Sequence, residues 1–220
     1  MDKTHQKFLR AGIDLSSVGA ERRTYNEPYD SFRFSKPEIL KLDGANMLTM
    51  KPIDGTPEEL KKAKALYYRA FPKHERRPFP ELVENRFGST EIFCFCDGEA
   101  FVGMACLLNT PAISHIIYLA VDESLQGHGY GSKALELLRQ SKPGKKIMVD
   151  IEVPDEQAEN TEQRRMRKKF YLRAGYEETP VKYEWQQENY EILSIGGQTS
   201  EAEYDGFWED LDAQAEQQNA

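Results

Sequence analysis

The sequence is poor in the residues that build disulfide frameworks, metal centres and membrane spans. It has 220 residues but only three cysteines, an odd number that predicts reduced thiols. No set of cysteines and histidines has the spacing of a metal site, so we expect no metal. The longest apolar runs, such as Ala112 to Val121, fall far short of the ~20 residues that cross a bilayer. The N-terminal segment also lacks the apolar stretch of a secretory signal, so the sequence predicts a cytoplasmic protein without membrane attachment.

The chain also lacks an excess of positive charge, which argues against nucleic acid as a partner. Its 29 lysines and arginines stand against 37 aspartates and glutamates, for a formal net charge of -8. Seven of these acids lie in residues 198–220, which contain no lysine or arginine. The remaining 197 residues hold 30 acidic and 29 basic residues, so the argument from charge is weaker for them. The basic run at 164–169 is interpreted as a solvated helix face rather than a nucleic-acid contact.

Composition divides the chain into three parts. Residues 1–45 are polar and turn-rich, and they predict an extension that packs on the body. A compact pattern covers residues 46–197, which we interpret as the main folded domain, called the body below. Residues 198–220 form an acidic extension, in which Phe207, Trp208 and Leu211 predict one short helix.

The body alternates between strand and helix patterns. The strands are predicted at 47–53, 92–96, 101–108, 113–121 and 145–152, with a last hairpin of 183–187 and 190–195 that turns at Glu188-Asn189. The helices are predicted at 56–71, 80–87, 129–140 and 162–174. Asp97-Gly98 is a strong hairpin signal between two of the strands. The strand–helix–strand unit around 129–140 needs parallel neighbours, so the order predicts an α/β fold with a mixed sheet.

A glycine-rich loop follows the apolar strand 113–121 and opens the next helix. It contains Gly127, Gly129 and Gly131. A helix N-terminus offers unpaired N–H groups and a positive dipole end, and glycines let an anion approach closely, so the loop is a candidate phosphate cradle. A tight turn without a ligand is the alternative. A dinucleotide fingerprint is also formally present at 129–134, with Asp150 about twenty residues on, but Asp122 to Gln126 separate its first glycine from the strand.

Two motifs in order resemble those of a known family. Gln126-Gly127-His128-Gly129-Tyr130-Gly131 fits the (Arg/Gln)-x-x-Gly-x-(Gly/Ala) signature of the GNAT N-acetyltransferase superfamily. A later helix bears Tyr171 shortly before Gly175-Tyr176, which is similar to the second motif of that family. The resemblance covers roughly residues 46–195. It implies a mixed, mostly antiparallel α/β sheet (α+β in some schemes) of about six to seven strands with about four helices.

The resemblance also implies acetyl-CoA as the cofactor and a transferase activity. The acetyl group would pass to a primary amine by direct attack in a ternary complex. The loop would hold the pyrophosphate, and the end of the preceding strand would pair with the pantetheine arm, as a peptide adds to a sheet edge. The cofactor-binding residues implied in this way are Leu119, Ala120, Val121, Gln126, Gly127, His128, Gly129, Tyr130, Gly131 and Ser132.

Tyr171 is our candidate general acid for the departing thiolate. A phenol with a pKa of ~10 keeps its proton at neutral pH and can donate it as charge develops on sulfur. Helical spacing predicts that Met166, Phe170 and Ala174 share the core face, and that Tyr171 lies on a polar stripe with neighbouring cations. A half-buried packing residue is the alternative interpretation of Tyr171.

The general base and the acceptor stay open at this point. Glu152, after the strand 145–152, and Glu75, between the two early helices, are the candidate bases, with His74, His115 and Tyr118 as further options. Each of them also fits a solvated charge or a satisfied polar group. The acceptor is a small-molecule or peptide amine, and the protein is a monomer or a homodimer. The rival hypothesis is an acyl-CoA-binding module that lacks an effective base.

Overall fold

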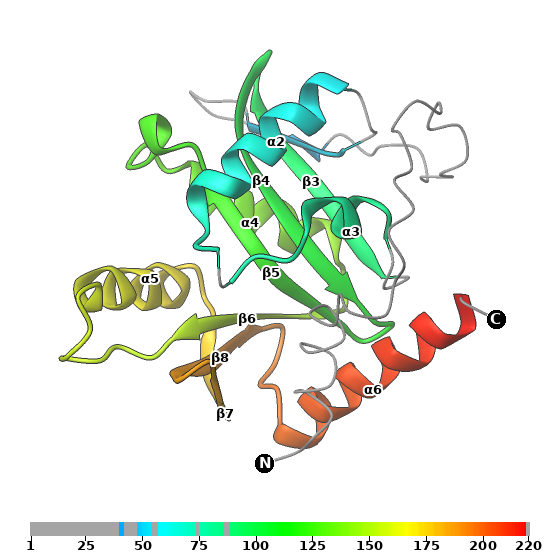
Figure 1. The fold of residues 1–220 in the computed structure, drawn as a ribbon, viewed down its shortest axis with the longest axis vertical. Helices are drawn as coiled ribbons and strands as arrows, with labels where there is room; N and C mark the ends of the chain where they lie inside the picture. The colour runs from blue at the N-terminus through cyan, green and yellow to red at the C-terminus, as the bar shows by residue number, and fades with distance from the viewer. Residues whose placement is uncertain (1–39, 42–47, 54–56, 74, 86–88, 219–220) are drawn as a thin grey trace.

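The computed structural model describes residues 40–41, 48–53, 57–73, 75–85 and 89–218 (Figure 1). They form one sheet in the order β1-β2-β3-β4-β5-β6-β8-β7. Its strands are β1 (Leu40–Lys41), β2 (Leu48–Pro52), β3 (Thr90–Asp97), β4 (Ala100–Asn109), β5 (Ile113–Val121), β6 (Lys146–Glu152), β7 (Glu177–Trp185) and β8 (Glu188–Ile195). The helices are α2 (Pro57–Ala70), α3 (Phe79–Val83), α4 (Tyr130–Ser141), α5 (Thr161–Arg173) and α6 (Glu201–Gln218), with a short 3-10 turn η1 (Glu123–Leu125).

The sheet confirms the predicted mixed, mostly antiparallel α/β fold. Among the described strands, only β5 and β6 pair in parallel, on either side of the crossover through α4, and the other neighbouring strands are antiparallel. The eighth strand is β1, whose two residues pair with Met50 and Thr49 at the edge of the sheet. It is the described part of the expected N-terminal extension, since 1–39 and 42–47 lie outside the described residues.

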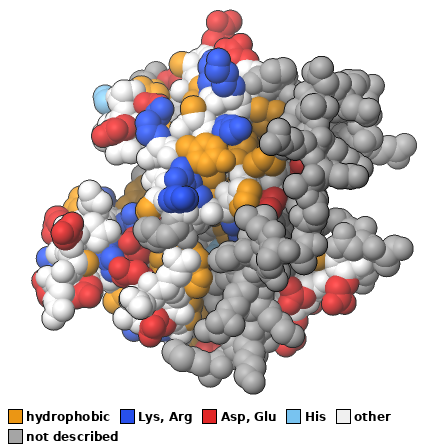
Figure 2. Space-filling view, in the orientation of Figure 1, with side chains coloured by type: hydrophobic (Ala, Val, Ile, Leu, Met, Phe, Trp, Pro, Cys, Tyr) orange, Lys and Arg blue, Asp and Glu red, His pale blue; other side chains and the backbone are white. Residues whose placement is uncertain are grey.

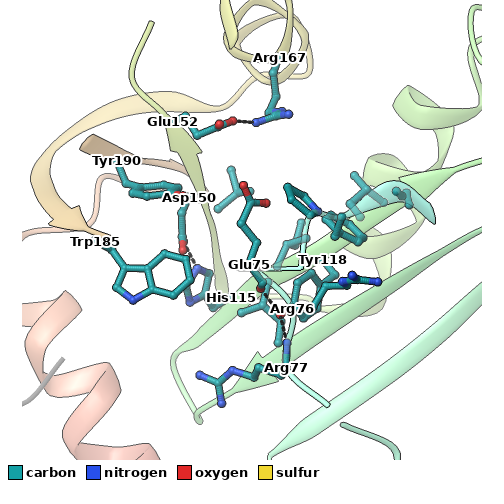
Figure 3. A pocket seen from close by; sticks show the side chains of 18 of the residues that line it. Glu75, Arg76, Arg77, His115, Tyr118, Asp150, Glu152, Arg167, Trp185 and Tyr190 are labelled. Carbon is teal, nitrogen blue, oxygen red and sulfur yellow. Dashed lines mark hydrogen bonds and ion pairs between the residues drawn. The ribbon is translucent and has the colours of Figure 1, made fainter. Parts of the chain in front are cut away.

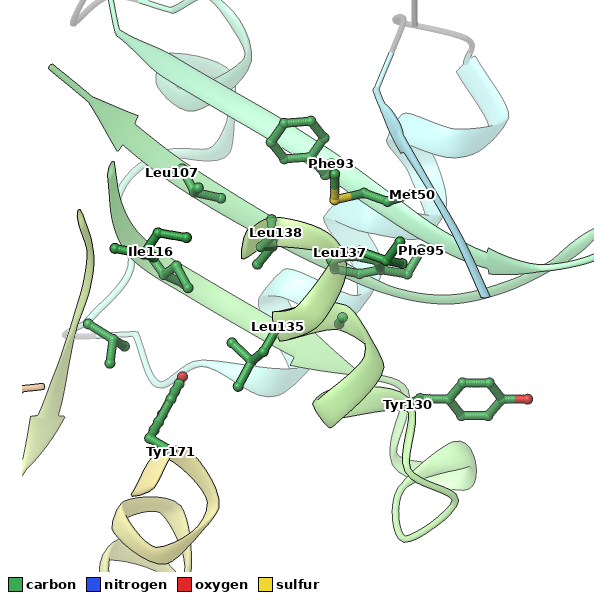
Figure 4. Packing of buried hydrophobic residues seen from close by; sticks show 14 of the residues in the cluster. Met50, Phe93, Phe95, Leu107, Ile116, Tyr130, Leu135, Leu137, Leu138 and Tyr171 are labelled. Carbon is green, nitrogen blue, oxygen red and sulfur yellow. The ribbon is translucent and has the colours of Figure 1, made fainter. Parts of the chain in front are cut away.

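The helices cover both faces of the sheet. On one face, the buried side of α4 packs over the central strands, and Tyr171 of α5 joins the same cluster (Figure 4). On the other face, α2 and α3 pack over β3 to β5, and α6 covers β6 to β8. Strand β5 is interior and carries apolar residues into both layers, which is why its sequence is a nearly continuous apolar run.

The last hairpin turns two residues earlier than predicted. The connection is Gln186-Gln187 rather than Glu188-Asn189, and β7 begins at Glu177 rather than 183. Both glutamines have left-handed backbones, with φ of 49° and 68°. A two-residue turn with positive φ matches the twist of paired strands, but it usually contains glycine or asparagine, so the glutamines gave no signal.

The acidic extension forms a helix much longer than the short one expected. Helix α6 has 18 residues and begins after Ser200. Ser200 and Glu203 form a reciprocal capping box, in which each side chain accepts the backbone N–H of the other, at 2.9 and 3.3 Å. The Lys146 ammonium, 2.6 Å from the Glu203 carboxylate, and the Ser200 hydrogen bonds lower the pKa of Glu203 to about 2. The sequence Ser-x-x-Glu was therefore a usable helix-start signal.

The inward face of α6 is part of the hydrophobic core. Tyr204, Phe207, Trp208 and Leu211 are at most 4% exposed and pack with apolar residues of β4 to β8. This face explains why an acidic segment folds, because its carboxylates occupy the solvent side. Among the described residues, no helix combines the length and apolar character needed to cross a membrane.

We predict that Leu211→Ala destabilises the protein by about 2–5 kcal/mol, because the side chain is fully buried and leaves a cavity. Glu209→Ala is the matched control, since Glu209 is exposed on the same helix and its loss leaves the core intact. The measurement is urea unfolding of both variants. Equal midpoints for the two variants would show that α6 does not contribute to the cooperative core.

Candidate active site

The site forms where two parallel strands diverge. Strands β5 and β6 pair only from Ile113 to Ile116 of β5, opposite Lys146 to Val149. Beyond that point β5 continues along β4 to Val121, while β6 continues along β8 to Glu152. The β6-facing backbone edge of 117–121 therefore borders a gap in the sheet. A cavity of about 550 Å³ lies at this gap.

A bulge and a glycine shape β5 at the divergence. Cys106 pairs with Tyr118 and Leu107 with Ile116, so Ile117 is an extra residue that bends the strand. On the next strand, Gly103 lies so close to β5 that a Cβ there would be 2.4 Å from the carbonyl oxygen of Ala120. Only glycine permits this approach, and it holds the end of β5 against β4.

The glycine-rich loop leads from the end of β5 into α4. Gly127 and Gly129 have φ of 79° and 82°, in the left-handed region, and Gly129 is the N-cap of α4. Open space surrounds the position of an added Cβ at both glycines. The first N–H groups of the 12-residue helix α4 therefore lie at an exposed loop beside the cavity. The helix dipole adds partial positive charge there. These features fit an anionic pyrophosphate.

Side chains around the loop fix its position. The Asp122 carboxylate accepts hydrogen bonds from the Ser124 N–H and hydroxyl at 3.1 and 2.7 Å, which caps η1. Arg69 at the end of α2 pairs with the same carboxylate at 2.6 Å. The Tyr130 hydroxyl donates to Asp97 at 2.7 Å and ties the start of α4 to β3. The glycine-rich loop is therefore held by contacts to both α2 and β3.

Tyr171 lines the cavity from the opposite side. Its ring is 6% exposed and belongs to the core cluster, and its hydroxyl points from α5 toward the space between β5 and β6 (Figure 4). None of the described residues hydrogen-bonds to that hydroxyl. Burial raises the pKa of Tyr171 above its ordinary value, so the phenol keeps its proton.

The predicted core face of α5 is wrong at Met166, whereas Phe170 and Ala174 are partly buried and pack against the core cluster. Met166 is 48% exposed, whereas Arg164 and Tyr171 are the buried residues of the helix. The cause lies outside the helix, because carboxylates at the end of β6 and at the start of β8 lie beside it. Arg164 pairs with Glu188 at 2.9 Å and hydrogen-bonds to Asn160 at 2.8 Å. A charge can be buried when it is paired in this way.

The basic run of α5 is largely neutralised by neighbouring carboxylates. Arg165 pairs with Glu156, and Lys168 pairs with Glu178 and Glu191 at 3.0 and 2.9 Å. Figure 2 shows basic and acidic side chains side by side over α5. The paired state leaves this run poorly suited to attract nucleic acid or to serve phosphates of a cofactor.

The two candidate bases have different surroundings (Figure 3). Glu152 is 7% exposed and forms an ion pair with Arg167, while Arg164 and Asn160 approach its other oxygen at 3.5 and 3.4 Å. Its oxygens are occupied by donors, so it is poorly placed to accept another proton. Glu75 points into the cavity from the segment between α2 and α3. His74, a further candidate, lies outside the described residues.

Tyr118 fastens the segment that carries Glu75. Its hydroxyl donates to the Glu75 carbonyl oxygen at 2.9 Å and accepts the Arg77 N–H at 3.1 Å. Burial raises the pKa of Tyr118, which keeps the phenol as the donor that this geometry needs. The structure thus makes Tyr118 a positioning residue rather than a base.

His115 belongs to a buried polar group that sequence reasoning did not assemble. It is fully buried, its Nε2 contacts the Asp150 carboxylate, and its ring packs edge-on against Phe207 and Trp208. The Tyr183 hydroxyl donates to the other Asp150 oxygen at 2.9 Å. Asp150 thus binds a histidine and a tyrosine beside the cavity. In a dinucleotide-binding fold, the other interpretation of the glycine loop, it would instead bind a ribose.

Several cavity residues were absent from the candidate set. Trp185, Tyr190 and Trp208 are among them and line the cavity from β7, β8 and α6. No local pattern marked them, because only the folded sheet brings these elements together. The alternation of aromatic residues in the last hairpin was a partial signal, since aromatic residues that share one strand face pack against the core or line a cavity.

The comparisons with known proteins identify the family. The model of the acetyltransferase (GNAT) family matches residues 60–176, just over half of the chain. The chain therefore belongs to the GNAT acetyltransferase family, as its two motifs predicted. The matched part contains β5, the glycine-rich loop and Tyr171, and it ends before Tyr183, Trp185, Tyr190 and Trp208.

Solved structures share the fold at low identity. An acetyltransferase assigned to the GNAT family, from Bacteroides thetaiotaomicron, is 21% identical with a TM-score of 0.63, over 74% of this chain and 96% of that one. An aminoglycoside 6'-N-acetyltransferase complexed with coenzyme A is 14% identical with a TM-score of 0.54, and the match covers 66% of this chain and 95% of that one. The ribosomal-protein-S18-alanine N-acetyltransferase from Escherichia coli is 16% identical with a TM-score of 0.52, over 70% of this chain and 97% of that one. No curated protein matches the sequence.

We predict that Tyr118→Phe destabilises the protein by about 1–3 kcal/mol, because the Arg77 N–H loses its acceptor. Tyr176→Phe removes the same atom from another buried ring, but the Tyr176 hydroxyl has no hydrogen-bond partner among the described residues. That control should therefore keep or slightly gain stability. The measurement is urea unfolding, with amide hydrogen exchange at Arg77. A Tyr118→Phe midpoint equal to that of Tyr176→Phe would contradict the assigned hydrogen bonds.

Proposed function

We propose that this protein transfers the acetyl group of acetyl-CoA to a primary amine by direct attack in a ternary complex. One observation carries the proposal: the diverging strands, Gln126 at the start of the loop that holds the left-handed glycines, and the buried Tyr171 all line one cavity. The first two features fit a long, anionic cofactor, and the third fits a proton donor. Family membership supports the same reaction class.

The cofactor would be held mainly by backbone groups. The N–H groups of Gln126 to Ser132 would bind its pyrophosphate at the start of α4. The backbone edge of Leu119 to Val121 would pair with the amides of its pantetheine arm, as an added strand would. The structure with coenzyme A among the similar folds supports this assignment. When bound, acetyl-CoA supplies a thioester carbonyl as the electrophile and a thiol as the leaving group.

Tyr171 would donate the proton that the leaving sulfur needs. Its phenolic oxygen keeps a proton because burial raises its pKa, and it points into the cavity. Proton donation from a buried site is effective because little water competes for the developing charge. Arg167, one helical turn earlier, is paired with Glu152 and would hold α5 in place rather than donate the proton.

Glu75 is the base that we assign for the acceptor. Its carboxylate points into the cavity, whereas both oxygens of Glu152 are approached by arginines or by Asn160. Glu75 would take the proton from the ammonium of the acceptor, directly or through one water. An α-amino group, with a pKa of about 7.7–8.0, needs less help than an alkyl amine with a pKa near that of lysine, about 10.4.

We predict that Gly129→Ala weakens CoA binding by about tenfold or more. The left-handed backbone costs an alanine roughly 1–2 kcal/mol, and its methyl would project into the space where the anion approaches. Gly98→Ala is the matched control, because Gly98 in the β3–β4 turn also has a left-handed backbone, with φ of 58°. The measurement is calorimetric titration with CoA. Unchanged affinity in Gly129→Ala would remove the loop from the cofactor site.

We predict that Tyr171→Phe lowers kcat by about 100-fold and leaves the CoA dissociation constant unchanged, because it removes only the proton donor. Tyr176→Phe is the matched control, since its ring packs against Tyr171 with centroids 5.3 Å apart. The measurement is amine-dependent thiol release from acetyl-CoA, using any amine that the wild-type protein accepts. Wild-type kcat in Tyr171→Phe would exclude the general-acid role. CoA binding without thiol release for a broad amine library would favour the acyl-CoA-binding module instead.

A further inference from the structure

Two free cysteines lie on one face of β3, away from the cavity. Cys94 and Cys96 are separated by one residue, so their side chains share a face of the strand. This face packs against α2, on the side of the sheet opposite α4 (Figure 1). Cys94 is fully buried, whereas Cys96 is partly exposed. Neither cysteine lines the cavity, so the proposed acetyl transfer does not use them.

The backbone at this pair suits a bond between the two sulfur atoms. Same-face neighbours in a strand have Cα atoms about 6.6 Å apart, which is within the span of about 4.4–6.8 Å that disulfides bridge. The register with β4 slips by one residue just before Cys96, where Val102 is the extra residue. Closing a disulfide to Cys94 therefore needs only a local adjustment, at a point where the ladder is already interrupted.

Charged side chains from β2 and α2 surround Cys96. The Lys51 ammonium of β2 is paired with the Glu59 carboxylate of α2. Lys62 of α2 also acts on Cys96 as a positive charge, and it pairs with Glu58 at 2.8 Å. The second carboxylate oxygen of Glu59 is buried and has no hydrogen-bond partner among the described residues. The sulfur of Cys96 is therefore influenced by two ammonium groups and one carboxylate.

This environment favours the thiolate at Cys96 and the thiol at Cys94. A hydrogen bond from Cys94 and the charge of Lys51 lower the pKa of Cys96 to about 7, although burial and Glu59 oppose them. The same hydrogen bond and burial raise the pKa of Cys94. The single Cys94 proton has a second acceptor in the Lys51 carbonyl oxygen, 3.6 Å from the sulfur. A partly exposed thiolate beside a buried thiol is the arrangement of a reacting and a resolving cysteine.

The third cysteine lacks these features. Cys106 of β4 is fully buried, and burial raises its pKa, so its thiol keeps its proton at neutral pH. It provides an internal control for reactions of the other two cysteines. Within the described ranges, no group of three ligand side chains could hold a metal ion, so metal binding does not account for the pair.

We propose that Cys94 and Cys96 are a redox-active dithiol, in which a peroxide oxidises Cys96 and Cys94 then closes a reversible disulfide. In the first step the Cys96 thiolate sulfur attacks a peroxide oxygen, so that an S–O bond forms, the O–O bond breaks and hydroxide leaves. In the second step the Cys94 sulfur attacks the Cys96 sulfur. The S–S bond forms, the S–O bond breaks, and the Cys94 proton leaves with the hydroxide as water. An external thiol reverses the reaction, and the inference is independent of acetyl transfer.

The test follows the thiols in the full chain. The reduced protein is treated with hydrogen peroxide, and the product is mapped by alkylation and mass spectrometry of its peptides. We expect a Cys94–Cys96 disulfide that dithiothreitol reverses. Iodoacetamide should label Cys96 at least about tenfold faster than Cys106, with a midpoint near pH 7. A disulfide that contains Cys106 or joins two chains, no disulfide at all, or a labelling midpoint near the ordinary value of ~8.5 would overturn the proposal.

Three variants separate the roles of the thiols. Cys94→Ala should stop the reaction at the sulfenic acid of Cys96, which a 1,3-dione reagent traps. Cys96→Ala should form no disulfide, and Cys106→Ala should form it as the wild-type protein does. Because Cys94→Ala empties a buried position, its folding is checked by urea unfolding, and the wild-type peptide map decides the proposal if this variant is unfolded. A folded Cys94→Ala protein without trapped sulfenic acid would contradict the assigned order of the two steps.

One further pair of variants tests the activation of Cys96. Lys51→Met should slow its alkylation at pH 7 about fivefold, because the thiolate loses a favourable ammonium. Lys64→Met is the matched control, since this lysine of α2 is exposed and its loss should leave the rate unchanged. Equal rates in the two variants would show that Lys51 does not activate the thiol.

Discussion

The early end of pairing between β5 and β6 is the constraint on which the rest of the site depends. Within the described part of the chain, the backbone groups of 117–121 that face away from β4 have no strand beside them. Buried N–H and C=O groups require partners, so the gap must admit water or a ligand that offers hydrogen bonds. A cofactor with amides along its arm satisfies this requirement. The extra residue Ile117 and the close contact at Gly103 keep β5 attached to β4 while it leaves β6.

The acidic extension has a structural role that its charge conceals. Taken as a composition, residues 198–220 account for seven of the eight units of net negative charge. In the fold, α6 supplies buried aromatic residues to the sheet and packs Trp208 against His115. The capping box and the Lys146–Glu203 ion pair begin the helix at the edge of β6. The negative charge of α6 therefore lies on its solvent face, and α6 contributes to the site through its apolar face.

Features encoded by short sequence segments could be predicted, and features that need distant segments could not. The Asp97-Gly98 turn, the helix start at Gly129 and the mixed sheet follow from local rules for backbone conformation and connection. The burial of Arg164 on α5 could not be predicted, because it depends on Glu188 of a distant strand, which pairs with it. The pairing of His115 with Asp150 likewise depends on the register of two parallel strands, which the sequence does not state locally.

This difference separates the two halves of the site. The half that fits the cofactor is made from the backbone of β5 and from one loop, which are contiguous in sequence and hence recognisable as a motif. The half that would receive the acceptor is made from side chains of the α2–α3 segment, β6, the β7–β8 hairpin and α6. Substitutions there change charge and shape without altering the backbone that holds the cofactor. A fold of this kind can keep its acyl donor while its acceptor changes, so the acceptor must be inferred from side chains such as Glu75, Asp150 and Trp185.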